Sequence, residues 1–200
     1  MNIGILGGSF NPIHIGHCIL ASYISQFVPS IDEVWLCVSP QNPLKDSADP
    51  AYDNHRLAMA KLAIAGCRNL KVCDIEFSLP RPSYSIDTLN RLKRDYPDHQ
   101  FRMIVGSDNW VNFHKWKDYQ TILKDFGLLV YPRPGYPIAP DENPGNVEFI
   151  EAPQFEISST FIRKAIQSGS DVRFLLPDNV RHYITQNQLY LNDYGYNQQK

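Results

Sequence analysis

Residues 3–17 read IGILGGSFNPIHIGH, and this stretch decides how the chain begins to fold. Its first part, Ile3 to Leu6, is a short apolar run that enters a glycine turn, and the residues that follow, to about Phe27, carry apolar side chains at helical spacing. A second continuous apolar run, Val34 to Val38, is typical of a parallel strand that is covered on both faces. The sequence therefore predicts a strand, a loop, a buried helix and a second parallel strand, joined as a right-handed unit.

The alternation of apolar strands and amphipathic helices continues along the chain. Residues 39–50 and 132–145 are rich in proline, and we expect both to form surface loops. The other predicted elements are, in order, a helix over 53–66, a strand over 70–75, a helix over 85–96, a strand over 101–105, a helix over 116–124, strands over 126–131 and 147–150, a helix from 158 and a helix over 177–189. This order predicts an α/β fold in which a parallel sheet carries helices on both faces. We expect one domain over 1–191 and a mobile polar tail over 192–200.

Composition narrows the classes of partner. The formal charge of -2 removes the simplest argument for binding long nucleic acids, which need a dense basic face, although small anions stay open as ligands. The sequence has no run of about 18 apolar residues, so it predicts no membrane span. It also lacks the basic start and long apolar run of a signal peptide. The four cysteines form no C-x-x-C pair, as is typical of free thiols in a reducing compartment. We expect a cytoplasmic protein that binds neither a membrane nor long nucleic acid, and the sequence leaves a homo-oligomer open.

Gly7 and Gly8 stand where the first predicted strand ends and a helix is about to begin. In an open parallel sheet, ligands bind beyond the carboxyl ends of the strands. Glycine lets backbone N–H groups approach an anion closely, and the amino end of a helix adds unpaired donors and the positive end of its dipole. His14 and His17 are three residues apart in the first helical turn, so both can project towards the same point. The loop is therefore a candidate phosphate site.

Three interpretations of this loop compete. The glycines can form an ordinary tight turn, with the two histidines acting as capping or core residues. The histidines can instead donate N–H groups that bridge phosphates as charge moves in a transition state, which we favour because both lie around a glycine directly after the turn. Metal binding by the pair needs a third ligand, and none is obvious nearby in the sequence, so we predict no metal site.

Two common nucleotide motifs do not occur in this chain. The P-loop pattern G-x-x-x-x-G-K-[ST] is missing, and so is the dinucleotide pattern G-x-G-x-x-G. The second predicted strand also ends in Val38-Ser39 rather than in an acidic ribose ligand. These observations argue against a P-loop nucleoside triphosphatase and against hydride transfer.

A second candidate anion site lies at residues 157–163, which read ISSTFIR. Ser158 is a good N-cap residue, and Ser159 and Thr160 place hydroxyl and N–H groups in the first turn of the helix. Arg163 lies four residues beyond Ser159 and so shares its face. The alternative is an ordinary capped amphipathic helix with a solvated arginine, and the two interpretations are equally good on this segment alone.

The two segments together resemble a known family. The stretch from Gly7 to His17 resembles the signature loop of the HIGH-type nucleotidyltransferases, and more narrowly of the bacterial nicotinate-nucleotide adenylyltransferases, while residues 157–163 match the family's second motif, I-S-S-T-x-I-R. The resemblance covers most of the chain. It implies a Rossmann-like fold of the nucleotidyltransferase type and transfer of AMP from ATP to nicotinate mononucleotide, giving deamido-NAD and pyrophosphate in NAD biosynthesis, with Mg²⁺ assisting.

The resemblance also implies which residues carry the chemistry. Lys45 would reach in from the loop after the second strand, although Leu44 stands where many members have histidine, and a lone lysine in a loop is usually just solvated. Asp108 would bind near the ribose or adenine, whereas an aspartate after a strand commonly caps a turn. The implied catalytic residues are His14, His17, Lys45 and Arg163. The implied ATP-binding residues are Gly7, Gly8, Ser9, Phe10, His14, His17, Asp108, Ser158, Ser159, Thr160 and Arg163.

The acceptor site rests on two further segments. Residues 82–89, PSYSIDTL, resemble the family's P-S-Y-T-I-D-T-L, which places Tyr84 and Ser85 at the acceptor. N–H groups at this helix start can bind the nicotinate carboxylate, and capping of the helix by Ser85 is compatible with that role. Trp116 sits where the family has an aromatic residue that stacks on the pyridine ring, although tryptophan is more often a core anchor.

The expected reaction is in-line attack by the acceptor's phosphate on the α-phosphorus of ATP, without a side-chain nucleophile. The protein then contributes positioning and charge stabilisation. One rival function is adenylyl or cytidylyl transfer by the same architecture to nicotinamide mononucleotide, phosphopantetheine or glycerol phosphate. Another is a nucleotide-sensing protein without catalysis.

Overall fold

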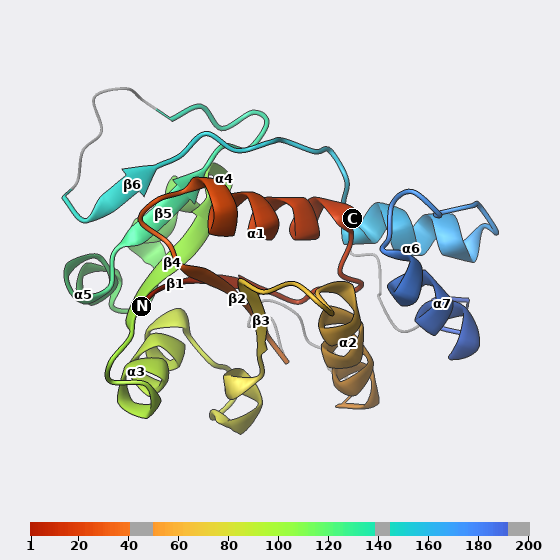
Figure 1. Ribbon diagram of the computed structural model, residues 1–200, viewed down its shortest axis with the longest axis horizontal. Helices are drawn as coiled ribbons and strands as arrows, with labels where there is room; N and C mark the ends of the chain where they lie inside the picture. Colours follow the sequence, from red (N-terminus) through yellow and green to blue (C-terminus); the bar gives the residue numbers. More distant parts are fainter. Residues whose placement is uncertain (41–49, 139–144, 192–200) are drawn as a thin grey trace.

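The computed structural model describes residues 1–40, 50–138 and 145–191. Its centre is a six-stranded sheet with the strand order β3-β2-β1-β4-β5-β6, and every neighbouring pair is parallel (Figure 1). The strands are β1 (Asn2–Gly8), β2 (Glu33–Val38), β3 (Leu70–Cys73), β4 (Gln100–Gly106), β5 (Leu128–Tyr131) and β6 (Val147–Phe149). The strand order reverses between β1 and β4, so the carboxyl ends of these strands form the crevice in which open parallel sheets bind ligands.

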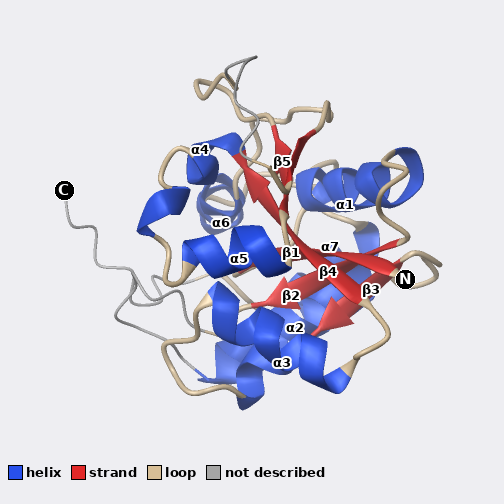
Figure 2. Ribbon diagram, turned by 90° about the vertical axis from the view of Figure 1, so that its left-hand side faces the viewer, coloured by secondary structure: helices blue, strands red, loops and turns tan. Residues whose placement is uncertain are grey.

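Helices cover both faces of the sheet, as the sequence predicts. The helices are α1 (Ile15–Phe27), α2 (Pro50–Ala63), α3 (Ser85–Asp95), α4 (Ser107–Trp110), α5 (Tyr119–Asp125), α6 (Ser159–Gln167) and α7 (Asp178–Gln186), with 3-10 turns η1 (Ile75–Ser78) and η2 (Phe113–Lys115). Figures 1 and 2 show α1 and α3 on opposite faces. The predicted Rossmann-like α/β class is confirmed.

Two cores follow from the alternation of side chains along the central strands. Val34 and Leu36 of β2 pack with α1, α2, α6 and α7 on one face, while Trp35 and Cys37 pack with α3 and α5 on the other. Both sets are buried, which is the reason that the strand reads as a continuous apolar run. Within the described residues, no helix combines the length and the apolar character that crossing a membrane requires.

The predicted glycine turn after Leu6 is wrong. β1 continues through Gly8 because β2 is long enough to pair with it, with Gly7 opposite Cys37 and Gly8 opposite Val38. The chain turns later, at Phe10, which has φ 43. The two glycines are therefore the last residues of the strand, at the edge where a ligand would lie.

Other predicted boundaries also need correction. The strand expected over 70–75 ends at Cys73 because η1 follows, and the helix expected from Trp116 begins at Tyr119 because Asp118, with φ 50, interrupts it. Ser85 is not the N-cap of α3; Tyr84 holds that place in extended conformation, and Ser85 is the first helical residue. Part of the loop predicted over 132–145, and the tail predicted over 192–200, lie outside the described residues.

Candidate active site

The two histidines of the first loop are stacked against each other at the start of α1. Their ring centroids lie 3.7 Å apart with the planes inclined by 27°, and the backbone N–H of His14 donates to Nδ1 of His17 at 3.3 Å. Phe10, whose ring is buried, packs edge-on against His17 at 5.0 Å. A side chain at Gly16 would come within 3.2 Å of the His14 ring, so the glycine between the histidines makes room for the stack. The pair therefore contributes to the cap of α1, and this geometry is compatible with its predicted role at a phosphate.

Burial keeps both imidazoles neutral. Burial, with a smaller contribution from the Arg133 cation, lowers the pKa of His14 from 6.5 to about 4. Burial also holds the pKa of His17 well below its usual value, with His14 and Arg133 adding to the effect. A neutral imidazole carries one N–H donor and one acceptor nitrogen. Near pH 7 the pair therefore presents N–H donors rather than full charges to an anion.

Lowering the pH from 7 towards 4 is expected to destabilise the free protein through this pair. The pKa of His14 falls from 6.5 in an unfolded chain to about 4 in the fold, so the unfolded chain binds more protons between these values. Above the unfolded pKa the pair costs no stability, and the cost grows as the pH falls from 6.5 to about 4. Urea titrations at several pH values in this range measure the free energy of unfolding. In His14→Asn this free energy should depend less steeply on pH. A variant with the wild-type slope would contradict the assignment.

Hydrogen bonds tie the start of α6 to the first loop. Ser158 caps the helix as predicted, its Oγ accepting from the N–H of Phe161 at 3.1 Å. The Ser159 hydroxyl donates to the carbonyl of Pro12 at 2.9 Å, and the Arg163 guanidinium donates to the carbonyl of Asn11 at 2.7 Å. Arg163 also donates to the Thr160 hydroxyl at 3.2 Å. Two segments almost 150 residues apart in sequence thus form one surface beyond β1.

A buried arginine that sequence reasoning missed braces the same loop from the other side. Arg56 of α2, only 4% exposed, donates to the backbone carbonyls of Ser9, Ser39 and Pro40 and to the carboxylate of Asp53. The bonds to Ser39 and to Asp53 measure 2.7 Å and 2.6 Å. Arg56 therefore fixes the first loop relative to the segment that leaves β2. In the sequence, a buried arginine of an amphipathic helix cannot be told apart from a solvated one, so no sequence signal identifies Arg56.

The ends of β4 and β5 contribute a third group. Asp108 lies in α4, directly beyond β4, with its Oδ1 3.9 Å from Nε of Arg133, and this oxygen is buried without a hydrogen-bond partner in the part of the chain described. The N–H of Arg133 donates to the buried hydroxyl of Ser107 at 2.9 Å. A side chain at Gly106 would come within 2.3 Å of Asp108 Oδ1 and so displace it. Arg133, whose charge acts on both histidines, was not predicted from sequence.

The two segments predicted to bind the acceptor meet at a lysine. Nζ of Lys117 lies 4.8 Å from the centroid of the Tyr84 ring and 3.3 Å from the carboxylate of Asp87 in the first turn of α3. Trp116 is partly buried and packs on Phe113, with ring centroids 5.1 Å apart, so it is both a core contact and partly open to solvent. The structure thus brings Tyr84 and Ser85 next to the segment that carries Trp116. Lys117 was missed because it looks like one more solvated charge beside His114 and Lys115.

One carboxylate links the predicted ATP-binding loop to the predicted acceptor segment. Asp53 binds Arg56 through one oxygen and Arg81 through the other, at 2.6 Å and 3.3 Å. Arg56 braces the first loop, and Arg81 directly precedes the segment 82–89. Lys45 lies outside the described residues, so its predicted role stays a prediction.

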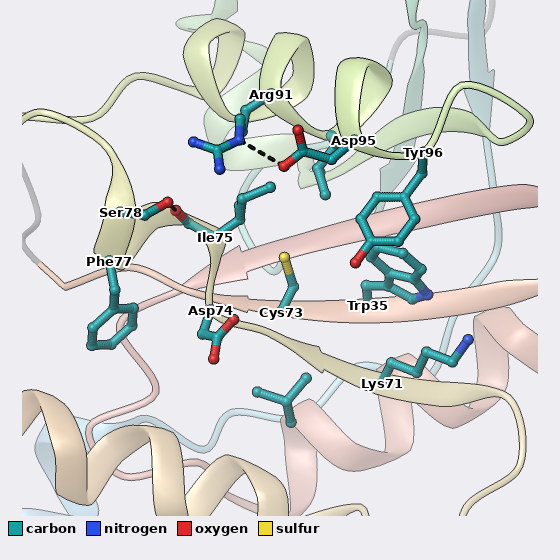
Figure 3. A pocket seen from close by; sticks show the side chains of 12 residues that line it. Trp35, Lys71, Cys73, Asp74, Ile75, Phe77, Ser78, Arg91, Asp95 and Tyr96 are labelled. Atoms are coloured by element: carbon teal, nitrogen blue, oxygen red, sulfur yellow. Dashed lines mark hydrogen bonds and ion pairs between the residues drawn. The ribbon is translucent and has the colours of Figure 1, made fainter.

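The cavity in Figure 3 is separate from the candidate site. It measures about 550 Å³ and lies beside the edge strand β3, where η1 and α3 face each other and Cys73, Arg91 and Tyr96 line it. None of the predicted site residues lines this cavity. A second cavity, about 710 Å³, is lined by residues of 132–138 and 149–154, Arg133 among them, and so borders the candidate site. Among the described residues, no group of three histidine, cysteine or acidic side chains is arranged to hold a metal ion.

Comparison with known proteins finds relatives that match this chain over most of its length. The model of the cytidylyltransferase-like family matches residues 5–165. A protein of Bacteroides fragilis named probable nicotinate-nucleotide adenylyltransferase is 50% identical over 183 residues, which is 92% of this chain and 90% of the relative. A protein of the same name from Flavobacterium johnsoniae is 42% identical over 95% of this chain and 99% of its own length.

Solved structures show the same fold at lower sequence similarity. The nicotinic acid mononucleotide adenylyltransferase of Plasmodium falciparum, solved in complex with NaAD, superimposes with a TM-score of 0.74 at 21% identity, covering 94% of this chain and 97% of the other. The likeness to this structure concerns the fold. The family match and the identity to the bacterial relatives go further: the chain belongs to the cytidylyltransferase-like family and, within it, to the nicotinate-nucleotide adenylyltransferases.

Proposed function

We propose that this protein transfers AMP from ATP to nicotinate mononucleotide and releases pyrophosphate and deamido-NAD. The observation that carries the proposal is the joining of α6 to the first loop, in which Arg163 donates to Asn11 at 2.7 Å beside the stacked His14 and His17. This arrangement combines helix-start N–H groups, neutral imidazoles and a guanidinium on one surface. A polyphosphate chain is the ligand that such a set of donors suits best.

The reaction on this surface is in-line displacement at the α-phosphorus. The acceptor's phosphate is already ionised near pH 7, so it attacks without a general base, and the bond to the leaving pyrophosphate breaks as the new P–O bond forms. In our proposal, His14 and His17 donate N–H groups to the phosphate oxygens, and Arg163 offsets charge on the leaving group. Lys45 is proposed to reach the same phosphates. Gly7, Gly8 and Ser9 lie at the end of β1, where their backbone faces the nucleotide.

Mg²⁺ fits this site only as a partner of the nucleotide. Among the described residues no cluster of acidic side chains forms a metal cage, and Mg²⁺ often binds through substrate phosphates and water with few protein ligands. When bound, the ion would neutralise charge on the phosphates of ATP. Asp108, whose Oδ1 is buried without a partner in the described part of the chain, is proposed to bind near the ribose or adenine. A cytoplasmic location is also proposed, and the four free thiols support it.

The acceptor is proposed to lie at the start of α3. N–H groups of the first turn, at Ser85, face its carboxylate, while Tyr84 and the open side of Trp116 border the pyridine ring. This places the acid form of the ring next to the positive end of the helix and the Lys117 ammonium.

Pyrophosphate release with each acceptor offered separately tests the proposal. The protein is incubated with ATP and Mg²⁺, and nicotinate mononucleotide, nicotinamide mononucleotide or phosphopantetheine is added. We expect release with nicotinate mononucleotide, which makes deamido-NAD as the second product. Release of pyrophosphate with phosphopantetheine but not with nicotinate mononucleotide would contradict the choice of acceptor. Binding of ATP without release of pyrophosphate in any mixture would favour a nucleotide sensor.

A further inference from the structure

Glu76 of η1 is a buried carboxylate underneath the start of α3. Its side chain accepts three hydrogen bonds although the residue is only 8% exposed. Oε1 accepts from the Thr88 hydroxyl at 3.0 Å and from the Cys37 thiol at 3.7 Å, and Oε2 accepts from the Ser83 hydroxyl at 3.1 Å. The donors come from three separate parts of the chain: β2, the segment before α3, and α3 itself.

Burying a carboxylate is costly unless donors compensate for the lost water. Hydrogen bonds to a charged acceptor are stronger than those between neutral groups, so a buried carboxylate with several donors holds them firmly. Ser83 and Thr88 stand on either side of Tyr84 and Ser85 in the sequence. Glu76 therefore anchors both ends of the short segment in which the acceptor-binding groups lie.

The start of α3 lacks a side-chain N-cap. Its N-cap residue, Tyr84, makes no side-chain capping hydrogen bond. A helix start of this type normally relies on a serine, threonine or aspartate side chain that bonds the first-turn N–H groups. Here the helix start is held from below by Glu76, and no N-cap side chain takes up the N–H groups of the first turn.

We propose that Glu76 is a positioning residue for the acceptor: by holding Ser83 and Thr88 it sets the place and direction of the α3 start that binds the acceptor's carboxylate. Glu76 acts through these two residues and contacts neither substrate. The inference rests on the proposed function, because it assumes that nicotinate mononucleotide binds at this helix start. The donors to Glu76 are Cys37, Ser83 and Thr88, and none of them is among the proposed ATP groups, so we expect Glu76 to act on the acceptor.

Glu76→Ala tests this role. We expect the KM for nicotinate mononucleotide to rise about tenfold, corresponding to the loss of about 1.4 kcal/mol of acceptor binding, with the KM for ATP unchanged. Glu76→Gln should behave like the wild type, because its amide oxygen accepts from one hydroxyl and its NH₂ group donates to the other. If Glu76→Gln is as defective as Glu76→Ala, positioning through these hydrogen bonds is wrong.

Two further variants complete the experiment. Ser78→Ala is the matched control, because Ser78 lies on the same 3-10 turn and its exposed hydroxyl donates only locally, to the carbonyl of Ile75 at 2.8 Å; both KM values should stay unchanged. Thr88→Val keeps the shape of the side chain and removes one donor, so it should raise the acceptor KM alone even if Glu76→Ala does not fold. An unchanged acceptor KM in Thr88→Val, or an equal rise in both KM values, would overturn the proposal.

The wild type measured in parallel separates the two claims. Turnover of nicotinate mononucleotide by the wild type, together with an unaffected acceptor KM in the Glu76 and Thr88 variants, defeats only the role of Glu76. No turnover of this acceptor by the wild type defeats the proposed function, and with it the premise of the inference.

Discussion

Replacement of His17 by alanine is expected to lower turnover on the order of 100-fold or more, which is the usual cost of losing one donor aimed at a developing charge. His17 stacks on His14 at 3.7 Å, and burial holds its pKa well below the usual value, so near pH 7 it is neutral and carries one N–H donor. The fold should survive, because His17 is partly exposed and belongs to neither hydrophobic core. Pyrophosphate release at saturating substrates measures turnover, and a thermal melt checks the fold.

A matched control is available on α7. His182 is an exposed histidine at the opposite end of the chain, and His182→Ala should leave turnover unchanged. Full turnover in His17→Ala would show that the first loop only binds or caps, and the assignment of the histidine pair would be wrong. A loss of turnover with a collapsed melting curve would be a structural effect, and His17→Asn then distinguishes the two because asparagine can still cap the helix.

Arg56→Met is expected to have the largest effect on stability. Arg56 and Asp53 form a buried ion pair, each 4% exposed, and removing one partner of such a pair typically costs about 3–5 kcal/mol. In Arg56→Met the buried carboxylate of Asp53 is left with its longer pairing to Arg81, at 3.3 Å. The variant also loses the bonds to the carbonyls of Ser9, Ser39 and Pro40, so the first loop is no longer braced. Urea unfolding measures the loss of stability, and the KM for ATP in the folded fraction should rise.

The pair Asp178 and Arg181 is the control for Arg56. It has the same spacing of three residues and an N–O distance of 3.2 Å, but it lies at the surface of α7. Exposed pairs contribute little, so Arg181→Met should change the free energy of unfolding far less than Arg56→Met. Similar losses in the two variants would mean that the buried pair is not the brace that its hydrogen bonds indicate. The double variant Asp53→Asn with Arg56→Met should recover part of the loss, since no buried charge is then left unpaired.

Periodicity predicted the fold well because both faces of the central strands are buried. β2 reads as an unbroken apolar run for that reason, and α1 carries its apolar residues at helical spacing. Periodicity did not predict the ends of elements that are set by strand pairing or by backbone conformation. β1 runs on through Gly8 because of its partner strand, and α5 starts late because Asp118 adopts a left-handed conformation, and neither fact is visible in residue type.

In the candidate site, too, some residues could be predicted from the sequence and others could not. Residues in short contiguous motifs, such as the histidine pair and the 157–163 segment, could be found from sequence because their spacing alone is distinctive. Arg56, Arg133 and Glu76 could not be found, because each is a single charged residue whose importance depends on contacts with other elements of the fold. The bonds that make them important are tertiary, and only the fold reveals them.

The measurement that tests the central claim most directly follows the α-phosphate of ATP. The protein is incubated with nicotinate mononucleotide, Mg²⁺ and ATP that carries a label on its α-phosphorus. If the first loop and α6 form one adenylyl-transfer site, the label moves into deamido-NAD while unlabelled pyrophosphate is released in equal amount. Recovery of the label in ADP or in free AMP, with none in the dinucleotide, would contradict adenylyl transfer and leave only phosphoryl transfer or hydrolysis.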